Sequence, residues 1–361
     1  MTDDIVVLGS GYAGTGAVKR LEREIDGEAD ITWISDVDHH LVLHESHRII
    51  RKPDVRDQIT FDCEELKAPS TRFVNARVEA LDTDERTVDL ADGSTVDYDY
   101  VLVAFGSRTA FFGIDGLREH SLTLKSLQDA LDIHDAVTDA AAEATKEDPA
   151  QVVVGGAGLS GIQSAGEIAE FRDLHRAPID IHLVEGLDNV FPNNDPVVQA
   201  KLAKLLDDKD VNVMTGEFIG EVDEETVYVQ DERSHRVHTE QDFTTNDERV
   251  FAIGDAALID QPGEENPAPP TAQAAWQAAE VAGVNLARAA RGEPLETWTH
   301  EDKGTLVSVG DEAVAHNVIG AREVVDTFGG PAAEMLKKTV AARWIKDVAG
   351  YGAAAKAFPD M

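Results

Sequence analysis

Two glycine-rich turns have the residue types and spacing needed to bind a dinucleotide. Each follows the pattern Gly-x-Gly-x-x-Gly, and the glycines are Gly9, Gly11, Gly14, Gly156, Gly158 and Gly161. In this pattern the first glycine permits a tight turn, the second lets the backbone approach a pyrophosphate, and the third lets helix and strand pack closely. The pyrophosphate lies at a helix N-terminus, where free N–H groups and the helix dipole favour an anion. The sequence therefore predicts two dinucleotide sites.

Each turn is followed by an acidic residue where an adenosine ribose would lie. Asp36 comes 22 positions after the last glycine of the first turn, and Glu185 comes 24 positions after the last glycine of the second. An acid at about this distance can accept hydrogen bonds from ribose hydroxyls. It would also repel a 2′-phosphate, so Glu185 favours NADH over NADPH.

The elements that must position these residues occur around both turns. Apolar strands and helices are predicted at residues 5–8, 17–25 and 30–35, and again at 151–154, 162–171 and 179–184. The second copy begins 147 residues after the first. An internal repeat of this size predicts an α/β chain with two Rossmann-like units. Further strands are predicted at 73–82, 87–90, 95–98, 100–104 and 305–309, and helices at 124–146, 271–290 and about 332–348.

Composition excludes several classes of function. The net charge of −37 arises from 69 acidic and 32 basic residues, which repels nucleic acid and is typical of salt-adapted cytoplasmic proteins. No apolar run approaches the roughly 18 residues of a membrane span, and no signal peptide is expected. The single cysteine, Cys63, cannot form a disulfide framework or a Cys-x-x-Cys pair.

A group of histidines follows Asp36. It comprises His39, His40, His44 and His47, and the spacing of the last three would put their imidazoles on one helical face. A metal cluster is one interpretation, but no supporting second-shell pattern is found nearby. We therefore predict a segment that lines the cofactor, and no metal site.

The chain resembles the two-dinucleotide-binding flavoproteins, the pyridine nucleotide oxidoreductases, in these two turns and in a strand that ends at Gly254-Asp255 (AIGDAA, residues 252–257). Within that group it is most similar to type II NADH:quinone oxidoreductases. The resemblance implies FAD at the first turn and NADH at the second, with Asp255 on the FAD ribitol. It also implies FAD contacts from Tyr12, Ala13 and Gly106, with Asp36 standing one place after Ser35, where the family usually has its acid.

Two further segments point to an electron acceptor. Residues 271–277 (TAQAAWQ) resemble the segment beside the isoalloxazine, and Gln273 and Gln277 are one helical turn apart, so both could face flavin and acceptor. The alternative is a solvated glutamine pair on a surface helix. The final helix, with Leu336, Val340, Trp344 and Val348 in one stripe and basic residues on its other faces, resembles the family's membrane-surface helix. A simple packing helix would show the same stripe.

Two departures from the family pattern accompany these matches. Gln163 stands where the family usually has a glutamate near nicotinamide and quinone, so hydrogen bonding is kept while a proton-accepting carboxylate is lost. The second unit also runs from a polar segment straight to Arg249, so its closing strand is predicted to be absent or heavily shortened. We take both as features that bear on activity.

The resulting prediction is an FAD-binding domain (1–115 and 230–330) with an inserted NADH-binding domain (116–229) and a C-terminal helical segment (331–361). The chain would oxidise NADH and pass electrons through FAD to a quinone or another small acceptor. Disulfide-reductase and sulfide:quinone mechanisms need paired thiols, so they are not expected of a chain with one cysteine. The alternatives are a soluble NAD(P)H:acceptor reductase and a non-catalytic flavin- or nucleotide-binding paralogue. A cytoplasmic location, peripheral membrane contact through the last helix and a homodimer complete the expectations.

Overall fold

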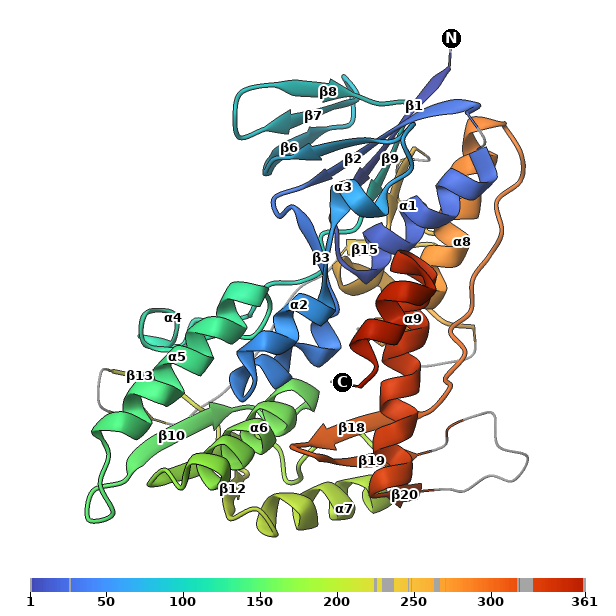
Figure 1. Cartoon of the computed structure of the whole chain (residues 1–361). Coiled ribbons are helices and arrows are strands. Elements are labelled where there is room, and N and C mark those ends of the chain that lie inside the picture. The colour runs from blue at the N-terminus through green and yellow to red at the C-terminus, as the bar shows by residue number, and fades with distance from the viewer. Residues whose placement is uncertain are drawn as a thin grey trace.

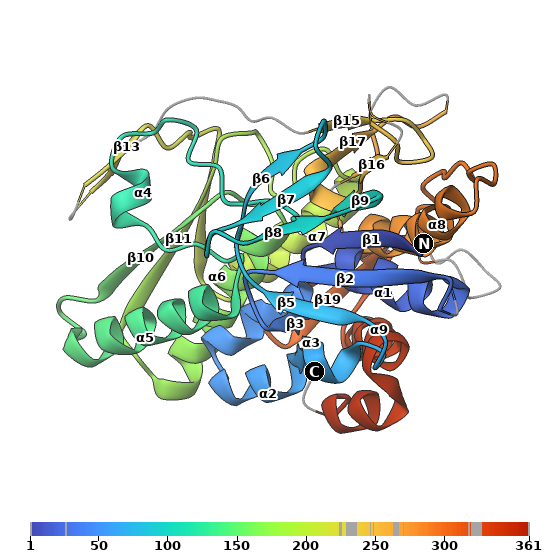
Figure 2. The ribbon, with the colours of Figure 1, turned by 90° about the horizontal axis from the view of Figure 1, so that it is seen from above.

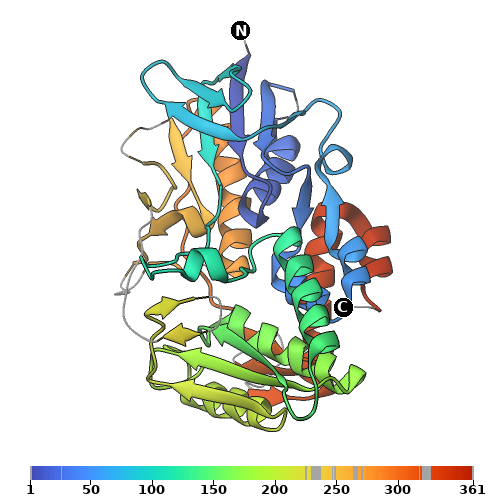
Figure 3. The same ribbon diagram turned by 90° about the vertical axis from the view of Figure 1, so that its left-hand side faces the viewer.

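The computed structural model describes residues 2–25, 27–223, 226–228, 237–245, 247, 249–262, 267–269, 271–316, 318 and 327–359. They form two α/β units and a long C-terminal helix (Figure 1). In Figure 3 the first unit lies at the top and the second at the bottom. The predicted fold of two Rossmann-like units with a C-terminal helix is confirmed.

The first unit is built on a five-stranded parallel sheet in the order β16–β9–β1–β2–β5 (Figure 2). The strands are β1 (Asp3–Leu8), β2 (Ala29–Ser35), β5 (Arg72–Asn75), β9 (Tyr100–Val103) and β16 (Val250–Ala252). Apolar side chains of β1 point to both faces of the sheet, and Ile5, Val7 and Leu8 are fully buried. Such continuous apolar runs are typical of parallel sheets covered on both faces.

Helices α1 (Tyr12–Ile25) and α8 (Ala272–Ala290) pack closely against each other beside this sheet. A Cβ atom on Gly16 would lie only 2.8 Å from the Cβ of Ala279, so the small residue permits the close approach. Helix α8 begins as predicted, because the side chain of Thr271 accepts a hydrogen bond from the third backbone N–H of the helix.

The predicted strand at 73–82 is wrong as a single element. The chain leaves the parallel sheet after Asn75 and enters a separate three-stranded antiparallel sheet at Val78. The strands of that sheet are β6 (Val78–Asp82), β7 (Thr87–Leu90) and β8 (Thr95–Asp97). The residues between the two strands, Ala76 and Arg77, carry no turn signal, which is why the break is not visible in the sequence.

The second unit has a three-stranded parallel sheet, β10–β11–β12, and a three-stranded antiparallel sheet, β18–β19–β20, and both sheets pack on α6. The elements are β10 (Ala150–Gly155), β11 (Ile179–Glu185), β12 (Val211–Thr215), α5 (Leu127–Glu143), α6 (Leu159–His175), α7 (Pro196–Asp207), β18 (Thr305–Val309), β19 (Glu312–His316) and β20 (Thr327–Gly329). Val307 and Val309 share a core with Ile162 and Ile168 of α6. The sequence had placed this antiparallel segment within the FAD-binding unit.

Strand β10 is open on one side. In the first unit β9 pairs with β1, but no strand of the described residues pairs with the corresponding side of β10. Val153 in β10 is 40% exposed, on a face of the strand whose other residues, Gln151 and Gly155, are exposed as well. The open side of β10 agrees with the shortened closing strand predicted from the sequence, although residues 229–236 of that segment lie outside the described part of the chain.

Shorter elements connect these layers. The helical ones are η1 (Leu43–Ile50), η2 (Pro53–Val55), α2 (Arg56–Ile59), α3 (Cys63–Leu66), α4 (Leu117–His120) and η3 (Gly254–Ala256). The strands pair as β3 (His39–Leu41) with β4 (Thr60–Asp62), β13 (Glu221–Val222) with β14 (Val227–Tyr228), and β15 (Val237–Thr239) with β17 (Ala257–Ile259).

The C-terminal helix α9 (Pro331–Ala357) packs against both units and bends at Gly350. Its predicted stripe is partly wrong: Trp344 and Val348 are buried, but Val340 is 39% exposed and Lys337 is buried in its place. The buried face of α9 is therefore shifted by about one residue from the predicted stripe. It includes Lys337, which forms an ion pair with Glu45. No helix in the described residues is long and apolar enough to cross a lipid bilayer.

Candidate active site

The first glycine turn has the geometry of a pyrophosphate-binding turn. Gly9 has φ of +110°, and a Cβ on it would lie 2.3 Å from the carbonyl oxygen of Ala104. A Cβ on Gly14 would lie 2.0 Å from the carbonyl oxygen of Gly9. A Cβ on Gly11, by contrast, would meet nothing within 4 Å. The turn thus requires glycine at two positions and leaves space at the third, in front of the N-terminus of α1, where an anion is favoured.

Other expected FAD residues gather at the carboxyl ends of the same sheet. Gly106 follows β9 and Gly254-Asp255 follow β16, its neighbour. Ser107 Oγ donates to Asp255 Oδ2 (3.0 Å), and Lys125 Nζ donates to Ser107 Oγ (2.9 Å). Ligands of open α/β sheets bind at this edge. The residues present therefore fit an FAD that extends from the first turn towards Asp255.

Residues Ser35 and Asp36 at the end of β2 differ in availability. Ser35 is buried, and its hydroxyl shares a hydrogen bond of 2.9 Å with the hydroxyl of Ser10 in the turn. Asp36 is exposed at the end of the strand. The structure thus ties Ser35 to the turn and leaves Asp36 as the carboxylate accessible to a ribose.

The second turn repeats this arrangement. A Cβ on Gly161 would lie 1.8 Å from the carbonyl oxygen of Gly156, whereas Gly158 faces open space. Glu185 accepts hydrogen bonds from the backbone N–H of Ala157 (2.7 Å) and of Leu187 (2.9 Å), one on each carboxylate oxygen. Each oxygen keeps a lone pair that could accept from a ribose hydroxyl.

The predicted acceptor residues Gln273 and Gln277 both bind the loop at 301–304. Gln273 donates to the carbonyl oxygen of Gly304 (3.1 Å) and accepts from the backbone N–H of Lys303 (2.7 Å). Gln277 donates to the carbonyl oxygen of Glu301 (2.8 Å) and accepts from its N–H (3.0 Å). Both glutamines are partly exposed, and their hydrogen bonds hold the loop that leads into β18. Nothing in the sequence signals this partner.

The histidine segment lies against the first turn and helix α9. His40 donates from Nδ1 to the carbonyl oxygen of Ser10 (2.8 Å) and accepts at Nε2 from the indole N–H of Trp344 (2.8 Å). Burial lowers the pKa of His40 to about 4, so its ring is neutral. The hydroxyl of Tyr12 is hydrogen-bonded to His44. The described residues hold no group of three side chains suited to a metal ion, and these imidazoles have other partners.

Gln163 lies in a buried polar cluster formed by four elements. Its Nε2 donates to Ser308 Oγ (3.1 Å) of β18, which also lies 3.1 Å from Nε2 of His47. Lys337 Nζ of α9 donates to Ser308 Oγ (3.0 Å) and lies 3.1 Å from Glu45 Oε1 of η1. All five residues are buried. Gln163 is among the site residues predicted from the sequence. Lys337 is not, because the sequence pattern places it on an outer face of its helix.

Arg51, at the end of η1, joins the two units through charge. Its guanidinium contacts Glu167 (2.8 Å) and Glu170 (3.3 Å) on α6, and it binds both carboxylate oxygens of Asp311. This hydrogen bonding lowers the pKa of Asp311 to about 2. Arg51 directly follows η1, which belongs to the histidine segment beside the first turn, and α6 starts at the second turn. This contact therefore fixes the relative position of the two turns.

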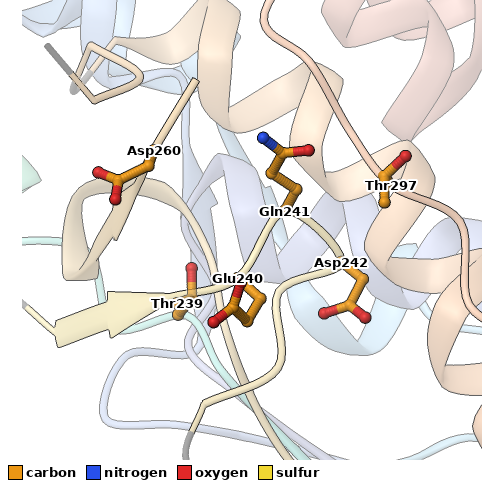
Figure 4. A pocket seen from close by; sticks show the side chains of 6 residues that line it. All are labelled: Thr239, Glu240, Gln241, Asp242, Asp260 and Thr297. Atoms are coloured by element: carbon orange, nitrogen blue, oxygen red, sulfur yellow. The ribbon is translucent and has the colours of Figure 1, made fainter. Parts of the chain in front are cut away.

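Two surface pockets lie away from the turns. One, of about 270 Å³, is lined by Thr239, Glu240, Gln241, Asp242, Asp260 and Thr297 (Figure 4). None of these residues belongs to the glycine turns or to the cluster around Gln163, so we assign this pocket no role. The other, of about 610 Å³, lies between η1, η2 and α9 and includes Arg48 and Asp311.

The fold and the two turns define a nucleotide-dependent oxidoreductase, and comparison with known families agrees. Residues 3–240 match the family described as pyridine nucleotide-disulphide oxidoreductase. Because this match covers more than half of the chain, the protein belongs to that family. The family resemblance predicted from the glycine turns and Gly254-Asp255 is confirmed.

Relatives and solved structures narrow the comparison. The chain is 28% identical to a type II NADH:quinone oxidoreductase of Staphylococcus aureus over 397 aligned positions, which cover 98% of this chain and 97% of the relative. The alignment is longer than this 361-residue chain, so the relative carries segments that are missing here. In fold, the chain is similar to NDH2 from Plasmodium falciparum in complex with NADH (TM-score 0.83, 15% identity, 100% and 98% coverage). It is also similar to the sulfide:quinone oxidoreductase of Aquifex aeolicus (TM-score 0.78, 17% identity, 97% and 92% coverage).

Proposed function

We propose that this protein is an FAD-dependent enzyme that oxidises NADH and passes the electrons to a quinone. The observation that carries the proposal is the pair of glycine turns, each followed by an acid, in one chain that matches type II NADH:quinone oxidoreductases over nearly their whole length. FAD would bind along the first turn and NADH along the second. When bound, FAD supplies the chemistry, by accepting a hydride and passing electrons on.

The chain's own residues bind and orient these groups. The first turn and the N-terminus of α1 would hold the FAD pyrophosphate, with Tyr12 and Ala13 beside it, Asp36 at the ribose and Asp255 at the ribitol. Glu185 would accept from both ribose hydroxyls of NADH. The glutamines of α8 would act on the acceptor side by holding loop 301–304 in place.

Cysteine chemistry does not contribute to the proposed reaction. Cys63 is buried, and burial raises the pKa of its thiol to about 12, so no thiolate forms at neutral pH. The protein therefore differs in mechanism from any relative that needs a reactive thiol.

We further propose peripheral contact with the cytoplasmic face of the membrane. Exposed apolar side chains along α9, Met335, Val340 and Tyr351, support this contact together with nearby lysines. Salt adaptation and a homodimer also remain predictions, the first motivated by the net charge of −37. The domain bounds predicted from the sequence are kept as a proposal. Residues 305–316 pack on α6, which favours assigning this segment to the second unit.

Acceptor preference tests the proposed function against a soluble reductase. The purified protein with bound FAD is assayed with NADH and, in turn, a short-chain quinone and a protein electron carrier such as oxidised ferredoxin. We expect the quinone to give the higher kcat/KM. A preference for the protein carrier would favour the soluble reductase, and a protein that purifies without yellow colour would favour the non-catalytic paralogue.

A further inference from the structure

A short segment that follows β12 runs alongside the end of β11 and is bonded to it. The N–H of Gly216 donates to the carbonyl oxygen of Leu187, and the N–H of Glu217 donates to the carbonyl oxygen of Glu185, both at 3.0 Å. We call residues 216–218 the brace. It holds the backbone on both sides of the residue that follows Glu185.

The ring of Phe218, the last residue of the brace, lies directly against Gly186. A Cβ on Gly186 would be 2.2 Å from Cε1 and 2.3 Å from Cδ1 of this ring, well inside van der Waals contact. Gly186 does not have the positive φ that favours glycine. Glycine is therefore required at this position by the Phe218 ring and not by the backbone conformation.

The braced backbone in turn orients the carboxylate of Glu185. One carboxylate oxygen accepts from the N–H of Leu187 at 2.9 Å, and the other accepts from the N–H of Ala157 in the second glycine turn at 2.7 Å. The Leu187 N–H belongs to the peptide that joins it to Gly186. A shift of that peptide away from the brace would therefore remove one of the two hydrogen bonds that fix the carboxylate.

The first unit provides an internal comparison. Ser35 corresponds to Glu185, because each directly follows the residue whose carbonyl oxygen accepts from the first glycine of its turn. Asp36 therefore corresponds to Gly186. The side chain of Asp36 is exposed, so the first unit accommodates a carboxylate one place later. In the second unit the Phe218 ring fills that place, and the acid can stand only at position 185.

This geometry affects which nucleotide the second turn accepts. In folds of this kind an acid at the strand end binds the ribose hydroxyls of NADH, whereas a nearby arginine accommodates the 2′-phosphate of NADPH. We propose that Phe218 determines the preference for NADH by acting through Glu185 and Gly186. Its ring holds the peptide that orients the Glu185 carboxylate, and it excludes a cationic side chain from position 186. The proposal rests on the function proposed above and makes Phe218 a positioning residue.

Binding of two nucleotides tests the positioning role without turnover. The oxidised protein with bound FAD is titrated by calorimetry with NAD⁺ and with its analogue that lacks the 2′-hydroxyl of the adenosine ribose. In the wild type, loss of the hydroxyl should weaken binding by about 10-fold, as expected for one hydrogen bond to a charged group. In Phe218→Ala this difference should largely disappear. Equal discrimination in variant and wild type would overturn the positioning role.

Two further variants separate this role from a general loss of packing. Phe218→Leu keeps an apolar side chain on Gly186 and should retain most of the discrimination. Phe171→Ala is the matched control, because it removes a ring that is 4% exposed from the last turns of α6, at the opposite end from the second glycine turn. It should discriminate between the two nucleotides as the wild type does. If Phe171→Ala loses the discrimination as well, the effect comes from the stability of the unit and the proposal fails.

The exclusion of a cation is tested by introducing one. Glu185→Ser with Gly186→Arg is compared with the same pair in a Phe218→Ala background, and reduction of the flavin by NADPH is followed. Removing the ring should raise kcat/KM for NADPH by about 10-fold, because the guanidinium then has space to bind the 2′-phosphate. Equal NADPH rates with and without the ring would overturn the exclusion.

The two ways of failing are distinguishable. If the wild-type protein does not bind NAD⁺ and NADH does not bleach its flavin, the proposed function fails, and the role of Phe218 fails with it. If the wild type binds NAD⁺ and Phe218→Ala discriminates against the analogue equally well, only the role of Phe218 is refuted.

Discussion

Replacing Lys337 by methionine should destabilise the fold strongly at neutral pH. Methionine keeps most of the side-chain volume but removes the ammonium that lies 3.1 Å from Glu45. The Glu45 side chain is only 1% exposed, so its charge would be left buried without its main partner. Breaking a buried pair from one side typically costs about 3–5 kcal/mol. Because Arg48 still lies 3.5 Å from Glu45, we expect about 3 kcal/mol, the lower end of that range.

The loss should depend on pH in a defined direction. In the wild type the pKa of Glu45 is lowered on folding, so its contribution is present above the unfolded pKa and is lost as pH falls through the folded one. Without Lys337, burial dominates and raises that pKa above the unfolded value. The contribution is then present at low pH and lost as pH rises. The difference in free energy of unfolding between wild type and variant should therefore be small near about pH 4. It should widen towards pH 7 by about 1.4 kcal/mol for each unit by which the folded-state pKa of Glu45 differs between the two proteins.

Urea unfolding of the FAD-saturated protein at high salt, monitored by circular dichroism at about pH 4 and at pH 7, measures this difference in free energy of unfolding. The double variant Glu45→Gln with Lys337→Met is the control, because it removes both charges and should recover much of the stability at pH 7. A loss that is equal at both pH values, or a double variant less stable than Lys337→Met, would refute the assigned ion pair.

Three other outcomes are expected. Cofactor released by heat should run as FAD on chromatography, because both turns are built for a pyrophosphate, which FMN lacks; recovery of FMN would contradict the first site. NADH should reduce the flavin faster than NADPH, and Glu185→Ser with Leu187→Arg should shift this preference, since Leu187 is 45% exposed beside the ribose site; equal rates in the wild type would remove Glu185 from the ribose. The melting temperature should rise steeply from low salt to molar KCl, where the Debye length is about 3 Å; a salt-independent value would argue against salt adaptation.

The sequence predicts the glycine turns and their flanking elements because the requirements there are local. A turn that needs φ above zero and close strand–helix contact can use only glycine, so the spacing of Gly9 and Gly14 identifies it without any knowledge of the rest of the chain. The cap at Thr271 is readable for the same reason. These local constraints fix both units and the cofactor class.

The polar cluster could not be predicted in the same way. Lys337 pairs with Glu45, which lies 292 positions earlier in the chain, and amphipathic periodicity assigns a lysine to the outer face of its helix. The loop held by Gln273 and the carboxylates held by Arg51 are likewise distant in sequence. Long-range polar contacts leave no periodic pattern in a sequence. Their residues can therefore be predicted from a single sequence only when a family motif includes them, as for Gln163.

The central claim is electron transfer from NADH through FAD to quinone, and an anaerobic titration tests it most directly. The absorbance of the bound flavin is followed while NADH is added, and then while a soluble quinone is added. The account predicts that one equivalent of NADH per flavin bleaches the spectrum and one equivalent of quinone restores it. A flavin that NADH does not bleach, or a bleached flavin that quinone leaves reduced, would contradict the account.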